Sequence, residues 1–234
     1  MPENHRQNSV PVIAIDGPSG SGKGTISRLL ARRLGWHFLD SGVLYRLVAL
    51  AAFRHSVPAD DEHALEKLAL DLDAGFAEDN QGLEVRIYLE GNEVTHEIRS
   101  EACSLGSSQI SVFPGVRRAL LEKQRAFRRM PGLVADGRDM GTVVFPQAEL
   151  KVFLTASQQE RANRRYKQLK DKEMDVNLDY LFQEIVARDE RDTKRAASPL
   201  RPATDAIVLD TTNLGIDEVV NTILRMWQNR ADIS

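Results

Sequence analysis

A glycine-rich loop that contains one lysine is the segment of this sequence whose residue types and spacing most directly predict chemistry. Residues 17–25 read Gly-Pro-Ser-Gly-Ser-Gly-Lys-Gly-Thr, and the spacing Gly17-x4-Gly22-Lys23 matches the phosphate-binding loop pattern. Glycines let backbone N–H groups turn toward an anion, and lysine adds a full positive charge. We therefore predict that the loop binds nucleotide phosphates, rather than being a glycine-rich turn with a chance lysine. Gly24 replaces the usual Ser or Thr, and the hydroxyl comes from Thr25 instead. The loop pattern therefore does not identify the hydroxyl that faces Mg²⁺.

Two further turns carry charged side chains at the ends of predicted strands. Residues 40–46 read Asp-Ser-Gly-Val-Leu-Tyr-Arg, and residues 134–141 read Val-Ala-Asp-Gly-Arg-Asp-Met-Gly. Open α/β sheets bind ligands at the carboxyl ends of their strands. Asp136 closes an apolar strand, where a carboxylate can hold Mg²⁺ through its water shell, and the planar guanidinium of Arg138 suits a phosphate. The alternative is that each segment is an ordinary exposed turn.

Two basic helical segments provide more positive charge. Each places charged residues within about one turn or at spacings of three and four, so that several share a helix face. The first contains Arg161, Arg164 and Arg165, and the second contains Arg188, Arg191, Asp192 and Arg195. One interpretation is a solvated helix face. The functional interpretation is a mobile lid whose arginines neutralise the transferred phosphoryl group and exclude water.

Alternating strand and helix patterns surround these segments. Short apolar runs predict strands at 10–16, 36–39, 133–136, 150–154 and 206–209, and helical spacing predicts helices at 26–34, 43–53 and 216–227. This alternation indicates an α/β fold with a central parallel sheet. Between about Phe76 and Val94, Asn and Gly at 80–82 and 90–92 predict instead a small antiparallel insert.

Composition narrows the class of protein. The chain has 234 residues and a formal net charge of −3, which argues against a protein that coats nucleic acid. Its one cysteine, Cys103, excludes an intramolecular disulfide and a four-cysteine zinc site. Residues 1–9 lack the apolar stretch of a signal peptide, and the most apolar run, Leu47–Phe53, is too short to cross a bilayer. We expect a cytoplasmic, monomeric domain over residues 10–230 that binds neither nucleic acid nor membrane.

Together, these segments resemble the bacterial cytidylate kinases, a family of P-loop nucleoside monophosphate kinases. The likeness runs from about Val10 to Trp227 and includes DGRDMGTVVFP at 136–146 and the pattern RDxxDxxR at 188–195, followed by Ser-Pro-Leu at 198–200. Gly24-Thr25 is usual in this family. The resemblance implies a three-layer P-loop NTPase-type domain with an NMP-binding insert at about 60–113 and a helical lid at about 157–195. It also implies transfer of the γ-phosphoryl group of ATP to CMP or dCMP with Mg²⁺ as cofactor.

The resemblance also assigns roles to single residues. The ATP phosphates would be held by the loop residues, which are Gly17, Pro18, Ser19, Gly20, Ser21, Gly22, Lys23, Gly24 and Thr25. The CMP α-phosphate would be held by arginines, which are Arg46, Arg138, Arg188 and Arg195. Ser41 and Asp192 would contact the sugar, and Ser108, Arg117 and Asp139 would contact the cytosine edge. Thr25 and, through water, Asp136 are the candidate metal residues.

Phosphoryl transfer needs little covalent chemistry from the protein, because positioning and charge screening supply most of the rate. We therefore expect no general base and nominate Lys23, Arg138, Arg188 and Arg195 as the catalytic set. Two alternatives stay open. The acceptor is instead UMP, dTMP or a small hydroxylated acid, or the chain is a nucleotide-sensing or nucleic-acid-binding module that uses its basic helices.

Overall fold

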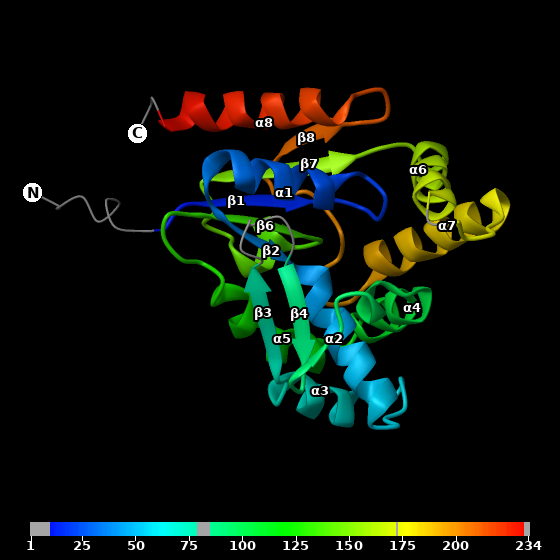
Figure 1. The fold of residues 1–234 in the computed structure, drawn as a ribbon. Coiled ribbons are helices and arrows are strands. Elements are labelled where there is room, and N and C mark those ends of the chain that lie inside the picture. The colour runs from blue at the N-terminus through cyan, green and yellow to red at the C-terminus, as the bar shows by residue number, and fades with distance from the viewer. Residues whose placement is uncertain (1–9, 79–84, 172, 232–234) are drawn as a thin grey trace, which may run out of the picture. The chain divides into compact units, whose positions relative to one another are not determined.

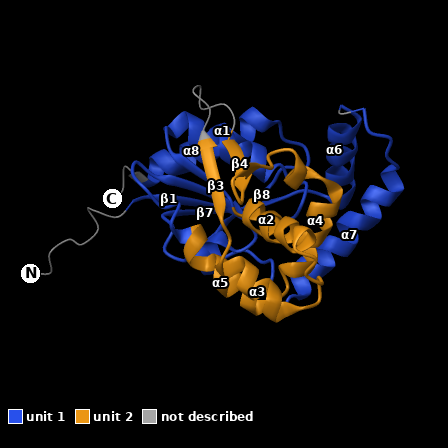
Figure 2. Cartoon of the chain, turned by 60° about the horizontal axis from the view of Figure 1, so that its bottom comes forward, with its two compact units in different colours: residues 1–40, 125–234 blue, residues 41–124 orange. Residues whose placement is uncertain are grey.

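The structure is a computed structural model that describes residues 10–78, 85–171 and 173–231. The chain divides into two compact units, of which the first contains residues 1–40 and 125–234 and the second residues 41–124 (Figure 2). The span 60–113, predicted for the NMP-binding insert, lies within the second unit. No helix among the described residues is long and apolar enough to cross a membrane.

A five-stranded parallel sheet forms the centre of the first unit (Figure 1). Its strand order is β2-β6-β1-β7-β8. In chain order the strands are β1 (Val12–Asp16), β2 (His37–Asp40), β6 (Leu133–Gly137), β7 (Leu150–Thr155) and β8 (Ile207–Asp210). Every residue of β1 and β6 is buried, which explains why their sequences are continuous apolar runs rather than alternating patterns. The predicted parallel sheet is therefore confirmed.

Two helices, α1 (Lys23–Leu34) and α8 (Ile216–Ala231), share one apolar core with the sheet. Leu30 of α1 and Ile223 of α8 are buried in this core together with Ile13 of β1. Helix α1 ends at Leu34 and is followed by Gly35, whose φ of 66° lies in the left-handed region that a glycine adopts without strain. Helix α1 begins at Lys23, three residues before the first apolar position of its pattern, because its first turn continues directly from the glycine-rich loop.

A helical pair, α6 (Gln158–Lys170) and α7 (Leu178–Lys194), follows strand β7 (Figure 1). Ser157 caps α6 by accepting a hydrogen bond from Glu160 N, and Asn177 caps α7 by accepting from Asp179 N and Tyr180 N. The two helices pack against each other. They occupy the span predicted for the lid, and the movement of that lid stays a prediction.

The second unit combines helices with a small antiparallel sheet. Its elements are α2 (Ser41–Arg54), α3 (Glu62–Leu70), β3 (Ala74–Glu78), β4 (Val85–Leu89), β5 (Asn92–Glu93), the 3-10 helix η1 (Glu97–Arg99), α4 (Glu101–Ile110) and α5 (Pro114–Arg125). The sheet order is β3-β4-β5 with antiparallel pairing, which confirms the predicted insert. Glu90 and Gly91 form its second turn with φ values of 51° and 75°. The first predicted turn, at 80–82, lies outside the described residues.

Candidate active site

Three aspartates lie at the carboxyl ends of neighbouring strands of the parallel sheet. Asp16 ends β1, Asp40 ends β2 and Asp136 is the last residue but one of β6. Asp40 is the register partner of Asp136, and Asp16 is the partner of Gly137. Because the strands are parallel, these carboxylates meet at one edge of the sheet, where the glycine-rich loop also begins. The sheet topology therefore places acidic groups beside the predicted phosphate site.

The loop after β1 forms a compact structure around a buried lysine. Gly20 and Gly22 have φ values of 78° and 88°, which side-chain-bearing residues rarely adopt. Lys23 is 8% exposed, and its Nζ donates a hydrogen bond to the carbonyl of Pro18 at 3.0 Å. Burial, and after it the positive charge of Arg138, lower the pKa of Lys23 to about 7. A bound polyphosphate would add negative charge and favour the charged lysine.

Asp136 has a buried carboxyl group that lies next to Gly24 in the first turn of α1. Burial raises its pKa to about 7, although the positive charge of Lys23 opposes the increase. Its Oδ1 is buried and has no hydrogen-bond partner among the described residues. A Cβ atom on Gly24 would lie only 3.2 Å from Asp136 Oδ2. Gly24 therefore replaces the usual Ser or Thr at a position where Asp136 leaves little room for a side chain.

Asp16 anchors the turn that follows Arg138, and the sequence analysis did not nominate it. Its Oδ1 accepts a hydrogen bond from Met140 N at 2.7 Å, and its Oδ2 accepts one from Gly141 N at 2.8 Å. Burial raises the pKa of Asp16 to about 6, against the effect of these two hydrogen bonds. These contacts hold η2 (Met140–Val144), a short π-helical turn, on the end of β1. The sequence signal that could have identified Asp16 is its position directly before the glycine-rich loop.

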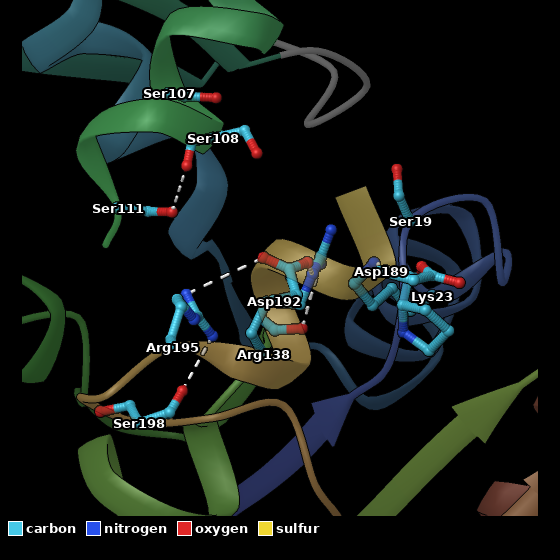
Figure 3. Close-up of polar contacts among 12 residues, drawn as sticks. Ser19, Lys23, Ser107, Ser108, Ser111, Arg138, Asp189, Asp192, Arg195 and Ser198 are labelled. Carbon is cyan, nitrogen blue, oxygen red and sulfur yellow. Dashed lines mark hydrogen bonds and ion pairs between the residues drawn. The ribbon is translucent and has the colours of Figure 1, made fainter. Parts of the chain in front are cut away.

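An aspartate and two arginines form a buried cluster at the end of α7 (Figure 3). Arg138 Nε lies 2.9 Å from Asp192 Oδ2, and Arg195 Nη1 lies 4.0 Å from Asp192 Oδ1. Arg195 Nη2 also donates to the carbonyl of Ser198 at 2.9 Å. Burial alone would raise the pKa of Asp192, but the charges of Arg138, Arg195 and Arg188 lower it below its ordinary value. Asp192 therefore stays a carboxylate that orients these guanidinium groups.

The four residues predicted to be catalytic gather in the first unit. The charges of Arg138 and Arg188 both act on Lys23, and the charge of Arg188 also acts on Asp192. Arg195 completes the set through its contact with Asp192. Lys23 begins α1, Arg138 directly follows β6, and Arg188 and Arg195 lie in and directly after the end of α7, so the set comes from segments that are far apart in the sequence. Such a concentration of cations suits an anionic ligand.

Arg161 and Arg164 of α6 hold the glycine-rich loop. Arg161 is 3% exposed and its Nη1 donates to Ser19 O at 3.0 Å. Arg164 Nη1 lies 3.4 Å from Ser21 O and 3.1 Å from Thr211 Oγ1, and its Nη2 donates to Thr211 O at 2.6 Å. Two of the basic residues of α6 therefore stabilise the glycine-rich loop through hydrogen bonds to its carbonyl groups. The lid role of these two arginines stays a prediction.

The remaining members of the predicted set lie at scattered positions in the first unit. Arg165 lies half-buried on α6. Thr25 is exposed at the start of α1, where a ligand can reach its hydroxyl. Asp139 is buried directly before η2, and its carbonyl accepts hydrogen bonds from Val143 N and Val144 N. Thr211, which the sequence analysis did not select, donates from Oγ1 toward Ser21 O at 3.2 Å and so contacts the loop directly.

The second unit contains the other predicted residues, of which Arg117 and Ser108 are connected through Ser111. The Arg117 guanidinium lies 5.6 Å from the ring centre of Tyr45, and its Nη1 donates to Ser111 O at 3.1 Å. Ser111 Oγ in turn donates to Ser108 O at 3.0 Å. Arg46 donates to the carbonyl of Ile98 at 3.2 Å. Ser41, which is also buried, is the first residue of α2.

The parallel sheet and the glycine-rich loop between β1 and α1 define the class of this chain, which is a P-loop protein. The family model for cytidylate kinase matches residues 13–229, and the chain belongs to this family. A cytidylate kinase from Shewanella denitrificans is 58% identical over 214 residues, which cover 92% of this chain and 94% of the relative.

A second relative supports membership of the same family. A cytidylate kinase from Pseudomonas fluorescens is 59% identical over 217 residues, which cover 93% of this chain and 95% of the relative. Among solved structures, a shikimate kinase from Acinetobacter baumannii aligns with a TM-score of 0.44 and 16% identity over 94% of each chain.

Proposed function

We propose that this protein transfers the γ-phosphoryl group of ATP to CMP or dCMP, giving ADP and CDP or dCDP. The observation that supports it most strongly is the cluster of Arg138, Arg188 and Arg195 around Asp192. The charges of Arg138 and Arg188 also act on Lys23 of the glycine-rich loop. A kinase with a phosphorylated acceptor must bring two anions together. Cations from both sites are therefore required to screen their repulsion.

On the donor side, the loop residues 17–25 would bind the ATP phosphates. Their backbone N–H groups and the N-terminus of α1 provide partial positive charge, and Lys23 provides a full charge at the β- and γ-phosphate oxygens. The contacts of Arg161 and Arg164 with Ser19 O and Ser21 O fix the loop from outside. A loop that is already ordered loses less entropy when the nucleotide binds.

On the acceptor side, Arg138, Arg188 and Arg195, with Arg46 of the second unit, would hold the α-phosphate of CMP. Asp192 and Ser41 would meet the sugar. Ser108, Arg117 and Asp139 would contact the cytosine edge. None of these groups removes a proton in our proposal, because positioning and charge screening account for most of the rate.

Mg²⁺ is the cofactor that we propose to accompany ATP, with Asp136 and Thr25 as the residues that would hold it. The described residues contain no group of three or more His, Cys, Asp or Glu side chains suited to a metal. Mg²⁺ does not require such a group, because it usually takes one or two carboxylates from the protein and fills its shell with phosphate oxygens and water. Asp136 Oδ1 has an unused acceptor position among the described residues. When bound, the ion would screen negative charge on the phosphoryl oxygens.

Acceptor profiling tests the proposal. ADP release by the purified protein is measured in a coupled assay with ATP and Mg²⁺, and with CMP, dCMP, UMP, dTMP, AMP or shikimate as acceptor. We expect the highest kcat/KM with CMP and dCMP, and poor use of UMP. Efficient turnover of another acceptor without turnover of CMP would overturn the assignment. Filter binding of oligonucleotides at increasing salt tests the nucleic-acid alternative, for which we expect no binding.

A further inference from the structure

Helix α7 carries a second buried ion pair one turn before Asp192. The carboxylate of Asp189 faces the guanidinium of Arg161 on α6, with Nη1 3.0 Å from Oδ1 and Nη2 2.5 Å from Oδ2. The two side chains are only 4% and 19% exposed. A bidentate pair with so little water around it is stronger and more specific in geometry than an exposed pair.

The same guanidinium extends the contact to the glycine-rich loop. Arg161 Nη1 also donates to Ser19 O at 3.0 Å, and Nε donates to Ala156 O at 3.0 Å. A Cβ atom on Gly20 would lie 3.0 Å from the Cβ of Arg161, so the loop packs directly against α6. Asp189, Arg161 and Ser19 therefore form an unbroken series of contacts from α7 to the loop that we propose for ATP.

The other side of this connection is the arginine cluster. Figure 3 shows Asp189 and Asp192 on the same helix, and their spacing of three residues places them one turn apart. Asp192 contacts Arg138, while Arg188 directly precedes Asp189 in the sequence. An α-helix is stiff over one turn. A ligand that fixes α7 through Arg188 and Asp192 therefore also fixes Asp189.

We propose that the Asp189–Arg161 pair couples the two nucleotide sites, so that bound CMP increases the affinity for ATP and bound ATP increases the affinity for CMP by the same factor. The inference rests on the proposed function, and both residues act as positioning residues. The two states are one with the pair formed, in which α7 is held on α6 and the loop, and one with the pair broken. Each nucleotide favours the first state, and thermodynamic linkage requires the two effects to be equal.

Titration calorimetry measures the coupling factor directly. The Kd of a non-hydrolysable ATP analogue is measured with and without saturating CMP, and the Kd of CMP with and without the analogue. We expect a factor of about five or more for the wild type. In Asp189→Asn, which keeps the side-chain shape and removes the charge, we expect the factor to fall toward one. Because each nucleotide favours the state with the pair formed, the Kd of each nucleotide alone should also rise in this variant. Coupling is a ratio of two Kd values measured on the same variant, so its loss is distinguished from weaker binding at either site.

Two further variants make the comparison decisive. Glu190→Gln is the matched control, because Glu190 is a neighbouring acidic residue whose pair with Lys194 is exposed and 3.7 Å long, and it should keep the wild-type factor. Arg161→Lys keeps the cation but loses the bidentate geometry, so we expect a factor between those of the wild type and Asp189→Asn. Thermal melting checks folding, and Arg161→Lys supplies the answer if Asp189→Asn does not fold.

The possible outcomes separate this inference from the proposed function. A folded Asp189→Asn protein with wild-type coupling overturns the inference, and so does a wild type that phosphorylates CMP but shows a factor of one. A wild type that does not phosphorylate CMP overturns the proposed function instead. The coupling factor is then measured with the acceptor that the protein does phosphorylate, and a factor of one there overturns the inference as well.

Discussion

Arg138 Nε donates a hydrogen bond to Asp192 Oδ2 at 2.9 Å and thereby joins the end of strand β6 to helix α7. The two residues are 54 positions apart in the sequence. Their side chains are 17% and 6% exposed, so the contact is largely shielded from water. A guanidinium held in this way has its orientation fixed before a phosphate arrives, which reduces the entropy lost on binding.

Removing a guanidinium from the cluster should remove catalysis without unfolding the protein. We expect Arg138→Ala and Arg188→Ala each to lower kcat by about 10²–10³-fold or more, because each loses a cation that we propose to hold the acceptor α-phosphate and to screen its repulsion from the transferred phosphoryl group. Steady-state kinetics with circular dichroism of the same samples measure this effect. Arg225→Ala, at an exposed position of α8, is the control and should keep wild-type turnover. Wild-type rates in folded Arg138→Ala and Arg188→Ala would remove these residues from the mechanism.

Asp192 should make stability depend on pH in a specific direction. Its pKa is lowered in the folded protein from the ordinary value of 3.8, so the carboxylate stabilises the fold fully above that value. This contribution is lost as the pH falls through the lower folded pKa. At pH 7 we expect Asp192→Asn to decrease the free energy of unfolding by about 1–3 kcal/mol.

Urea unfolding of the wild type and Asp192→Asn between pH 7 and pH 3 measures the difference between them. We expect the difference to narrow only below about pH 4, where the unfolded carboxyl group begins to bind its proton. A difference that stays constant throughout this range, or that grows as the pH falls, would contradict the lowered pKa.

Thr211 should affect the donor site alone. Its Oγ1 lies 3.1 Å from Arg164 Nη1 and 3.2 Å from Ser21 O, so Thr211→Val removes a hydroxyl that contacts the loop and leaves a side chain of similar shape. We expect the KM for ATP to rise about tenfold, which corresponds to roughly 1.4 kcal/mol, because the contacts of the hydroxyl with Arg164 and with Ser21 O are both lost. The KM for CMP should not change. Thr222→Val on α8 is the control, and an equal rise in both KM values would argue against a donor-side role.

A side chain at position 132, now occupied by Gly132, should destabilise the fold for a reason unrelated to catalysis. A Cβ atom at this position would lie 2.3 Å from Cδ2 of Trp36, whose ring packs edge-on against Trp227 at a centroid distance of 5.0 Å. We expect Gly132→Ala to lower the free energy of unfolding by about 1–3 kcal/mol, because the indole must move within a packed core. Gly215→Ala, which would meet no atom within 4 Å, should be close to neutral. Urea titration of both variants compares them.

The regular elements and the donor loop were predictable because their signals are local. A buried parallel strand needs a continuous apolar run, and Val12–Asp16 has one. A loop that wraps around phosphate needs glycines, and residues 17–25 provide them at a recognised spacing. Contacts between residues that are far apart in the sequence have no comparable local signal. The roles of Asp16, Asp189 and Thr211 depend on partners 124, 28 and 190 positions away.

By itself, the sequence determined the class of fold, the position of the phosphate-binding loop and the family, since each depends on residue type and spacing within a short segment. Only the tertiary structure decided which of the many arginines face one another and which support the backbone. Arg161 and Arg138 are the same residue type, yet Arg161 holds a loop carbonyl and Arg138 holds Asp192. The physical reason is that the sequence position of an arginine does not determine which acceptor its guanidinium contacts. Its partner is set by which carboxylate or carbonyl the packed strands and helices bring within hydrogen-bond distance.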